Sequence, residues 1–177
     1  MRLRIGLLMG VVGLGLLSSM ALAKPAKYRK PIRIVVWDER QPAQKQIYPN
    51  FLGNHIAEYF RQLVRDKNER EPEFTVKSVG LDDPEQGLSQ ETLDECDVLI
   101  WWGHQRHNDL KIERAKEIAR RVKEGKLSLF ALHSAHWSLP FMETMNERSI
   151  QDALKALTPA ERKGVHVEPI APEHRQP

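Results

Sequence analysis

Hydrophobic residues along the chain alternate between strand-like and helix-like segments. Four runs rich in β-branched or aromatic residues have the length of strands, and they span 32–37, 74–79, 97–102 and 127–132. Apolar residues spaced three and four apart predict helices over 54–64 and 112–122, with a short helix after Ser89 and a last helix over 149–157. Asn54 and Ser89 are expected to cap their helices, and Gly125 is expected to end one.

The order of these segments predicts a doubly wound α/β fold with a mostly parallel sheet and helices on both faces. The run over 97–102 is the most apolar and is expected at the centre of the sheet. The run over 74–79 alternates apolar and polar residues and is expected nearer an edge. No internal repeat or long linker divides the chain. We therefore expect one α/β domain over 31–142, followed by a helix and a proline-rich tail over 143–177.

The first 23 residues have the features of an export signal. Arg2 and Arg4 precede a short apolar run, and small residues end the segment at Ala23. This pattern is typical of a secretory signal peptide cleaved at that point. The apolar run is shorter than the roughly 18–20 residues that cross a bilayer, so a retained membrane anchor is the weaker alternative. We expect a periplasmic or extracellular protein without a stable transmembrane anchor.

Composition narrows the class of function. The 177-residue chain is 41% hydrophobic and 29% charged, which is typical of a globular protein. Its net charge of +3 falls to +1 without Arg2 and Arg4, and the remaining basic residues do not form a patch, so we expect no nucleic-acid partner. Cys96 is the single cysteine of the sequence, which excludes an intrachain disulfide. Its place just before an apolar strand predicts packing rather than a reactive thiol.

Candidate functional residues gather after the predicted strands. In an open parallel sheet, ligands bind outside the carboxyl ends of the strands. The candidates there are Asp38 and Glu39 after the first strand, Trp102, His104 and His107 after the third, and His133, Ser134, His136, Trp137 and Ser138 after the fourth. We expect these residues to share one edge of the sheet, here called the rim.

The rim histidines allow several kinds of chemistry. Two His-x-x-His pairs with nearby carboxylates suit zinc or another divalent cation, and we assign His104 and His107, with His133, to such a metal. Alternatively, a histidine acts as a general acid or base, or Ser134 acts as a nucleophile with a histidine as its base. We assign His133, Ser134 and His136 to catalysis. The structural alternative is that the histidines only cap strand ends.

A second group of rim residues is assigned to substrate binding. It comprises Asp38, Glu39, Trp102, Trp137 and Ser138. A tryptophan on the rim offers a large apolar ring with a polar N–H, against which a sugar ring can stack. Core packing with one half-exposed ring is the alternative for Trp102 and its neighbour.

Several segments of the chain resemble the ThuA-like family, which is named for trehalose utilisation. They are 35–39, 47–49, 97–104 with His107, and 132–138 with Phe141, and segment 81–88 is similar as well. The resemblance spans residues 31 to 142. It implies a flavodoxin-like fold of the class I glutamine amidotransferase-like superfamily and a role in the catabolism of trehalose or a modified disaccharide, with a small sugar as the substrate.

Three features depart from the pattern of the family or of its superfamily. True amidotransferases carry their nucleophile in a Gly-x-Cys-x-Gly turn, whereas His133 stands at the cysteine position here, so we expect no glutamine hydrolysis. The family domain also continues past the fourth strand, which predicts that this chain is a C-terminally shortened version. The ThuA-like family further implies a glycine at the position of Ala135.

The expected function is therefore metal-assisted or acid–base chemistry on a sugar. The alternatives are a non-catalytic carbohydrate-binding or accessory module and an inactive homologue. A serine hydrolase built on Ser134 is disfavoured, because no Gly-x-Ser-x-Gly turn surrounds that residue. A homo-oligomer stays an open alternative.

Overall fold

The computed structural model describes residues 30–66, 73–103 and 105–170. In chain order the elements are β1 (Ile32–Asp38), the 3-10 helix η1 (Pro42–Gln46), α1 (Leu52–Asp66), β2 (Phe74–Gly80), η2 (Pro84–Gly87), α2 (Gln90–Asp94), β3 (Val98–Trp102), η3 (His107–Asp109), α3 (Ile112–Lys123), β4 (Ser128–Ala131), η4 (His133–Trp137) and α4 (Leu139–Ala156). Strands and helices alternate along the chain in the order that the sequence predicts.

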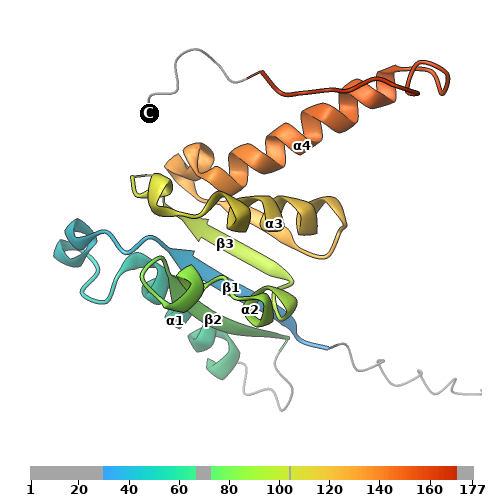
Figure 1. Cartoon of the computed structure of the whole chain (residues 1–177). Helices are drawn as coiled ribbons and strands as arrows, with labels where there is room; N and C mark the ends of the chain where they lie inside the picture. The colour runs from blue at the N-terminus through green and yellow to red at the C-terminus, as the bar shows by residue number, and fades with distance from the viewer. Residues whose placement is uncertain (1–29, 67–72, 104, 171–177) are drawn as a thin grey trace, which may run out of the picture.

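The strands form a single parallel sheet in the order β2-β1-β3-β4 (Figure 1). β1 and β3 are central, and β2 and β4 lie at the edges of this sheet. This is the strand order of flavodoxin-like folds as far as the fourth strand. The predicted α/β fold class is therefore confirmed, and so are the central place of 97–102 and the edge place of 74–79.

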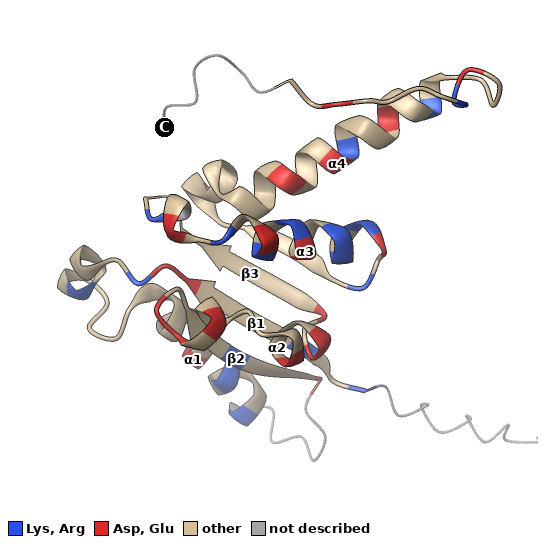
Figure 2. Cartoon of the chain, viewed as in Figure 1, with Lys and Arg blue, Asp and Glu red and all other residues tan. Residues whose placement is uncertain are grey.

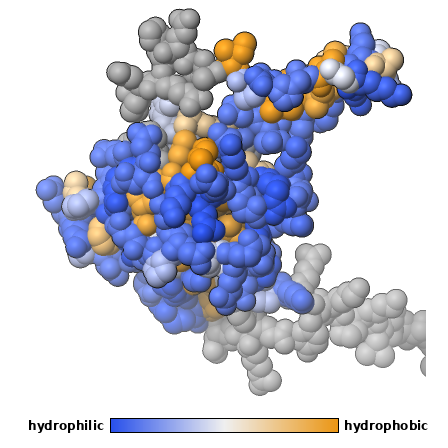
Figure 3. Space-filling view, viewed as in Figure 1, coloured by the Kyte–Doolittle hydropathy of each residue, from blue (hydrophilic) through white to orange (hydrophobic). Residues whose placement is uncertain are grey.

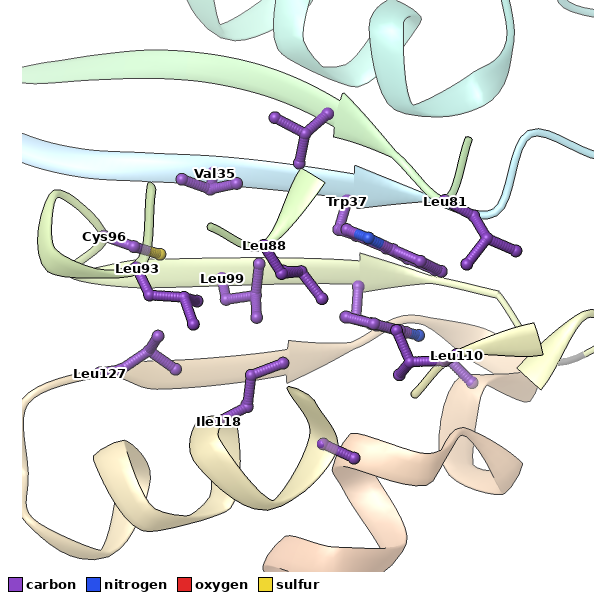
Figure 4. Close-up of a cluster of buried hydrophobic side chains, with 14 residues drawn as sticks. Val35, Trp37, Leu81, Leu88, Leu93, Cys96, Leu99, Leu110, Ile118 and Leu127 are labelled. Atoms are coloured by element: carbon purple, nitrogen blue, oxygen red, sulfur yellow. The ribbon is translucent and has the colours of Figure 1, made fainter. Parts of the chain in front are cut away.

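Helices cover both faces of the sheet, because successive side chains of a buried strand point to opposite sides. On one face, α1 packs over β1 and β2, and Ala57 lies in a cluster with Val36 and Ile100. On the other face, α2 and α3 cover a larger cluster (Figure 4). Trp37 and Trp101 stack within this larger cluster, with ring centroids 3.6 Å apart.

Two helices begin at other residues than the sequence predicts. α4 begins at Leu139 rather than at residue 149, because Pro140 fits the first turn of a helix, where its missing N–H is not needed. It crosses the expected boundary at 142/143 and packs against α3, where Lys123 pairs with Glu147 at 2.7 Å. α1 begins at Leu52, so Asn54 lies inside the first turn instead of capping it.

The other expected helix signals are confirmed. The Ser89 hydroxyl caps α2 by accepting a hydrogen bond from the Thr92 N–H at 3.1 Å. Gly125 follows α3 with a φ of +68°, the left-handed conformation that glycine adopts most readily.

Cys96 is 2% exposed, and burial raises the pKa of its thiol to about 11, which fits a packing role.

The surface of the described chain is mixed in charge and mostly hydrophilic. Figure 2 shows basic and acidic residues interleaved along α3, and Figure 3 shows hydrophilic residues over most of the visible face with smaller apolar areas between them. Within the described residues, none of the helices combines the length and the hydropathy needed to span a bilayer. The predicted export signal, residues 1–23, lies outside the described residues.

Candidate functional site

The carboxyl ends of all four strands meet at one edge of the sheet, as predicted for the rim (Figure 1). β1 leads to α1 on one face, whereas β3 leads to α3 on the opposite face. In open α/β sheets, the ligand-binding crevice forms where loops diverge in this way. Asp38 ends β1 directly beside Trp102, the last residue of β3.

Asp38 is fully buried and holds the loop between β1 and α1. Its carboxylate accepts hydrogen bonds from the backbone N–H groups of Arg40 (2.7 Å) and Gly53 (2.7 Å) and from the Gln44 amide (3.1 Å). Gln44 in turn accepts the N–H of Leu52 at 3.0 Å. A buried carboxylate is tolerated only when donors surround it. Asp38 therefore fixes both ends of this loop.

Glu39 is also fully buried, but it holds the loop between β3 and α3. Its carboxylate accepts the backbone N–H groups of Gln105 (3.2 Å) and Arg106 (2.9 Å) and the side-chain amide of Gln41. The Glu39 backbone joins the same loop, since its N–H donates to the Trp102 carbonyl at 3.1 Å and its carbonyl accepts from the Arg106 guanidinium at 3.1 Å. Glu39 thus positions the loop that carries two of the predicted metal ligands.

Both carboxylates direct their oxygens into the protein. Asp38 and Glu39 are each 0% exposed and brace loops, so contact with a substrate stays a prediction and would require this bracing to open. Ser138, also assigned to substrate binding, is 1% exposed, and its hydroxyl donates to the Ala135 carbonyl at 2.6 Å.

A histidine and a tryptophan lie side by side at the ends of β4 and β3. The ring centroids of His133 and Trp102 are 6.1 Å apart, with an angle of 55° between the ring planes. His133 is exposed and Trp102 is half-buried. The backbone of His133 has a φ of +48°, a left-handed conformation that residues other than glycine rarely adopt. This turn holds the imidazole beside the indole ring.

The remaining candidates after β4 lie on the same 3-10 turn, η4. His136 is exposed, and its ring centroid lies 5.5 Å from that of half-buried Trp137. Ser134 is half-buried, and Ala135 is fully buried against the core. The three residues assigned to catalysis, His133, Ser134 and His136, therefore come together within one turn at the rim.

The predicted metal site is only partly within the described chain. His104 lies outside the described residues, and so does the side chain of His107, so the assignment of these two residues stays a prediction. Within the described ranges, no group of three or more His, Cys, Asp or Glu side chains is arranged to hold a metal ion.

Arginines and acids join the loops on the outer side of the rim. Arg106 pairs with Asp82 at 2.8 Å and with Asp109 at 3.1 Å, and Arg40 pairs with Asp83 at 2.9 Å. The hydrogen bond from the Arg106 guanidinium lowers the pKa of Asp82 below its usual range. These pairs connect the loop after β2 to the loops after β3 and β1.

The loop after β2 contains a left-handed turn. Glu85, Gln86 and Gly87 have φ values of +53°, +59° and +69°. Left-handed backbone costs about 1–2 kcal/mol for each residue other than glycine. The turn is held by the Trp37 indole N–H, which donates to the Gln86 carbonyl at 2.8 Å, and by the Gln86 amide, which donates to the Asp109 carbonyl at 2.7 Å.

Backbone strain is confined to this edge in the described part of the chain. All residues other than glycine with positive φ lie in the loops at the carboxyl ends of the strands: Arg40, Phe51, Glu85, Gln86 and His133. Strained backbone persists where surrounding contacts hold it, and it is concentrated at functional sites. The strain and the candidate side chains therefore indicate the same edge.

Sequence reasoning missed the residues that brace the rim. Gln41, Gln44 and Arg106 belong to no recognisable motif. The carboxylates that Gln41 and Gln44 bind lie two and six residues away in the chain, and Asp82, a partner of Arg106, lies 24 residues away. Gly53 offered a signal, because glycine is the usual residue where backbone must approach another group closely. A Cβ added at Gly53 would lie 2.6 Å from the Asp38 Cβ.

Comparison with protein-family models and with curated proteins finds no match. The fold and the site define a flavodoxin-like α/β protein whose strained rim presents histidine and tryptophan side chains.

Proposed function

We propose that this chain is an exported ThuA-like protein that acts on a small sugar, trehalose or a modified disaccharide, at the rim. The observation that carries the proposal is the His133–Trp102 pair, with rings 6.1 Å apart. An indole ring offers apolar area on which a sugar can stack, and an imidazole exchanges protons near neutral pH. Both side chains lie where ligands bind in sheets of this type.

The backbone at His133 supports a reactive role for its imidazole. In the superfamily that the sequence resembles, the corresponding residue is the nucleophile of a sharp turn after the strand. The φ of +48° is consistent with such a sharp turn. At this position the imidazole would act as a general acid or base towards a sugar hydroxyl or a water molecule, while Trp102 orients the ring.

A divalent metal such as zinc is an accessory part of the proposal. His104 and His107, with His133, would hold it, and a metal there would polarise a carbonyl or activate water. Of these three side chains, only that of His133 lies within the described residues, so the role proposed for His133 does not depend on a metal.

A non-catalytic carbohydrate-binding module is the second candidate. Most glycoside hydrolases use two carboxylates at the scissile bond. At this rim, Asp38 and Glu39 are 0% exposed and brace loops, which favours binding without hydrolysis. Stacking on Trp102 serves either function.

The two candidates are separated by measuring binding and turnover on the same variants. Mature protein is titrated with trehalose and sucrose by calorimetry, and released glucose is measured in parallel. Trp102→Leu should abolish binding, whereas His133→Asn should keep binding and lose turnover. His166→Asn is the matched control, because His166 lies in the exposed tail beside Glu168 at 2.8 Å.

Each outcome has a defined meaning. Binding without turnover in the parent protein favours the carbohydrate-binding module. No binding of either disaccharide, or equal binding in Trp102→Leu and the parent, would overturn the proposal. Export is tested by the mass of the protein in the extracytoplasmic fraction, which should correspond to a chain that starts at Lys24. A full-length chain in the membrane fraction would indicate a retained anchor instead.

A further inference from the structure

A hollow lies between the β1–α1 loop and the first turns of α1, lined by none of the rim candidates named above. Its volume is about 230 Å³. Its lining includes Tyr48, Asn50, Phe51, Asn54, His55 and Glu58. None of these residues belongs to the hydrophobic core clusters.

The loop that forms the hollow is held in place by the protein itself. The Gln44 carbonyl accepts the N–H of Tyr48 at 2.8 Å, and the Tyr48 carbonyl accepts the N–H of Phe51 at 2.9 Å. The Gln44 side chain connects the N–H of Leu52 to buried Asp38. Phe51 has a φ of +63°, which costs a bulky residue about 1–2 kcal/mol. The hollow is therefore preformed, as small-molecule sites usually are.

The lining combines aromatic rings with neutral polar groups. The rings of Tyr48 and His55 lie 5.3 Å apart at an angle of 46°. The Asn54 amide donates to the Asn50 side-chain oxygen at 3.2 Å. Each carboxamide has two donor hydrogens and an acceptor oxygen, so this pair leaves further donors and acceptors for a ligand. Aromatic rings beside carboxamides suit a ligand with apolar C–H faces and several hydroxyl groups.

The charge at the hollow is already balanced. Glu58 is ionised and pairs with Arg65 at 2.6 Å and with Arg61 at 3.5 Å, and the hydrogen bond from Arg65 lowers the pKa of Glu58. Lys45 lies over the Phe51 ring, 4.9 Å from its centroid. An ionic ligand would have to compete with these interactions, whereas a neutral ligand would not. The balance favours a neutral, hydroxylated ligand.

We propose that this hollow is a binding site for a single neutral sugar ring, stacked against Tyr48 and hydrogen-bonded by Asn54 and His55. The inference goes beyond the function proposed above, because it adds a second site that is argued from the lining of the hollow and not from the His133–Trp102 pair. In a protein that acts on disaccharides, such a site would hold a second sugar near the rim.

The test is a titration of the mature, ¹⁵N-labelled protein with glucose, followed by amide chemical shifts. Saturable shifts are expected at the amides of Phe51, Asn54 and His55, with millimolar affinity. His55→Ala should weaken binding about fivefold or more, the equivalent of one lost hydrogen bond or ring contact. Tyr59→Ala is the matched control, because Tyr59 is a 58% exposed aromatic residue on the same helix outside the hollow. The affinity of this variant for glucose should equal that of the parent.

The outcomes separate this inference from the proposed function. Absence of saturable shifts at these amides, or equal weakening by His55→Ala and Tyr59→Ala, would overturn the inference. Shifts confined to Trp102 and His133 would overturn it too, while supporting the proposed function. A third outcome combines the glucose titration with the calorimetry described above. If glucose shifts the amides of the hollow in His133→Asn, and if neither disaccharide binds at Trp102, the inference is supported and the function proposed for the rim is rejected.

Discussion

The edge of the sheet where the strands end, the rim, is built differently from the opposite edge, where the strands begin. At the rim, Asp38 and Glu39 are fully buried, and every residue other than glycine with positive φ in the described chain lies in the loops there. At the opposite edge, where the strands begin, the tight turn before β4 uses Gly125, for which a φ of +68° is unstrained. Among the described residues, which leave out 67–72 before β2, the opposite edge has no strained residue other than glycine, whereas the rim holds costly conformations in place.

The acidic residues at the rim and at the opposite edge also differ, in burial and in the cost of losing a partner. Asp97 at the opposite edge is partly exposed, pairs with the Arg33 side chain at 2.6 Å and accepts the backbone N–H of Arg33 at 2.8 Å. The side-chain hydrogen bond from Arg33 lowers the pKa of Asp97. Exposed pairs of this kind contribute about 0–1 kcal/mol, whereas removing a partner from a buried charge costs about 3–5 kcal/mol. The contrast teaches that the buried acids of the rim are committed to the geometry of loops, whereas Asp97 is not.

The largest expected difference comes from removing one acid at each edge. Glu39→Ala leaves the N–H groups of Gln105 and Arg106 without their acceptor and should lower the free energy of unfolding by about 3 kcal/mol. Asp97→Ala should lower it by about 1 kcal/mol, because water can replace the lost partner. Urea unfolding followed by tryptophan fluorescence measures both, and equal losses would contradict the comparison.

The next test places the same methyl group at each edge. In Gly53→Ala the new Cβ would lie 2.6 Å from the Asp38 Cβ, and the resulting strain should cost about 2–3 kcal/mol. In Gly125→Ala no atom lies within 4 Å of the new Cβ, so only the positive φ costs stability, about 1 kcal/mol. Thermal unfolding compares the two variants. A Tm for Gly53→Ala at or above that of Gly125→Ala would mean that the rim is not tightly packed.

Acid should weaken the face of the sheet that α3 covers through Glu117, which lies midway along α3, away from the rim loops, and pairs with Arg120 and with buried Arg121. The hydrogen bond from Arg120, with a further one from Arg121, lowers the pKa of Glu117 to about 2 from an ordinary value of 4.5. A lowered pKa stabilises the fold above pH 4.5, and this stabilisation is lost as the pH falls towards 2. We expect a loss of about 2 kcal/mol over that interval.

Glu117→Gln isolates this contribution. The variant should be less stable than the parent at pH 7, and the difference should shrink as the pH falls from 4.5 to 2. Glu113→Gln on the same helix is the control, because Glu113 is exposed and has no ion pair within the described chain. A Glu117→Gln variant with the same pH dependence as the parent would show that the pair does not titrate as expected.

The smallest expected effect concerns the strain at His133. Glycine adopts a φ of +48° freely, so His133→Gly should raise the free energy of unfolding by up to about 1 kcal/mol. His136 is also exposed on η4 but does not have a positive φ, so His136→Gly should lower the free energy by about 1 kcal/mol. Effects of the same sign in the two variants would indicate that His133 is not strained.

Local patterns in the sequence were enough to predict the fold class. Alternation and apolar runs identified all four strands, and the spacing of Ile56, Phe60 and Val64 identified the helix that became α1. The boundaries were less accurate where a residue allows two interpretations. Pro140 can end a segment or begin a helix, and only the packing of α4 against α3 decides between them.

The sequence by itself determined the order of the elements and the gathering of histidines, tryptophans and acids after the strands. Parallel strands bring their carboxyl ends to one edge, so sequence position alone places these residues together. Only the tertiary structure decided what Asp38 and Glu39 do there. Some of their donors, such as the N–H groups of Gly53 and Arg106, come from residues distant in the chain, and no local pattern encodes those distances. The strained φ of His133 was likewise decided by the surrounding contacts, because an isolated chain would relax it.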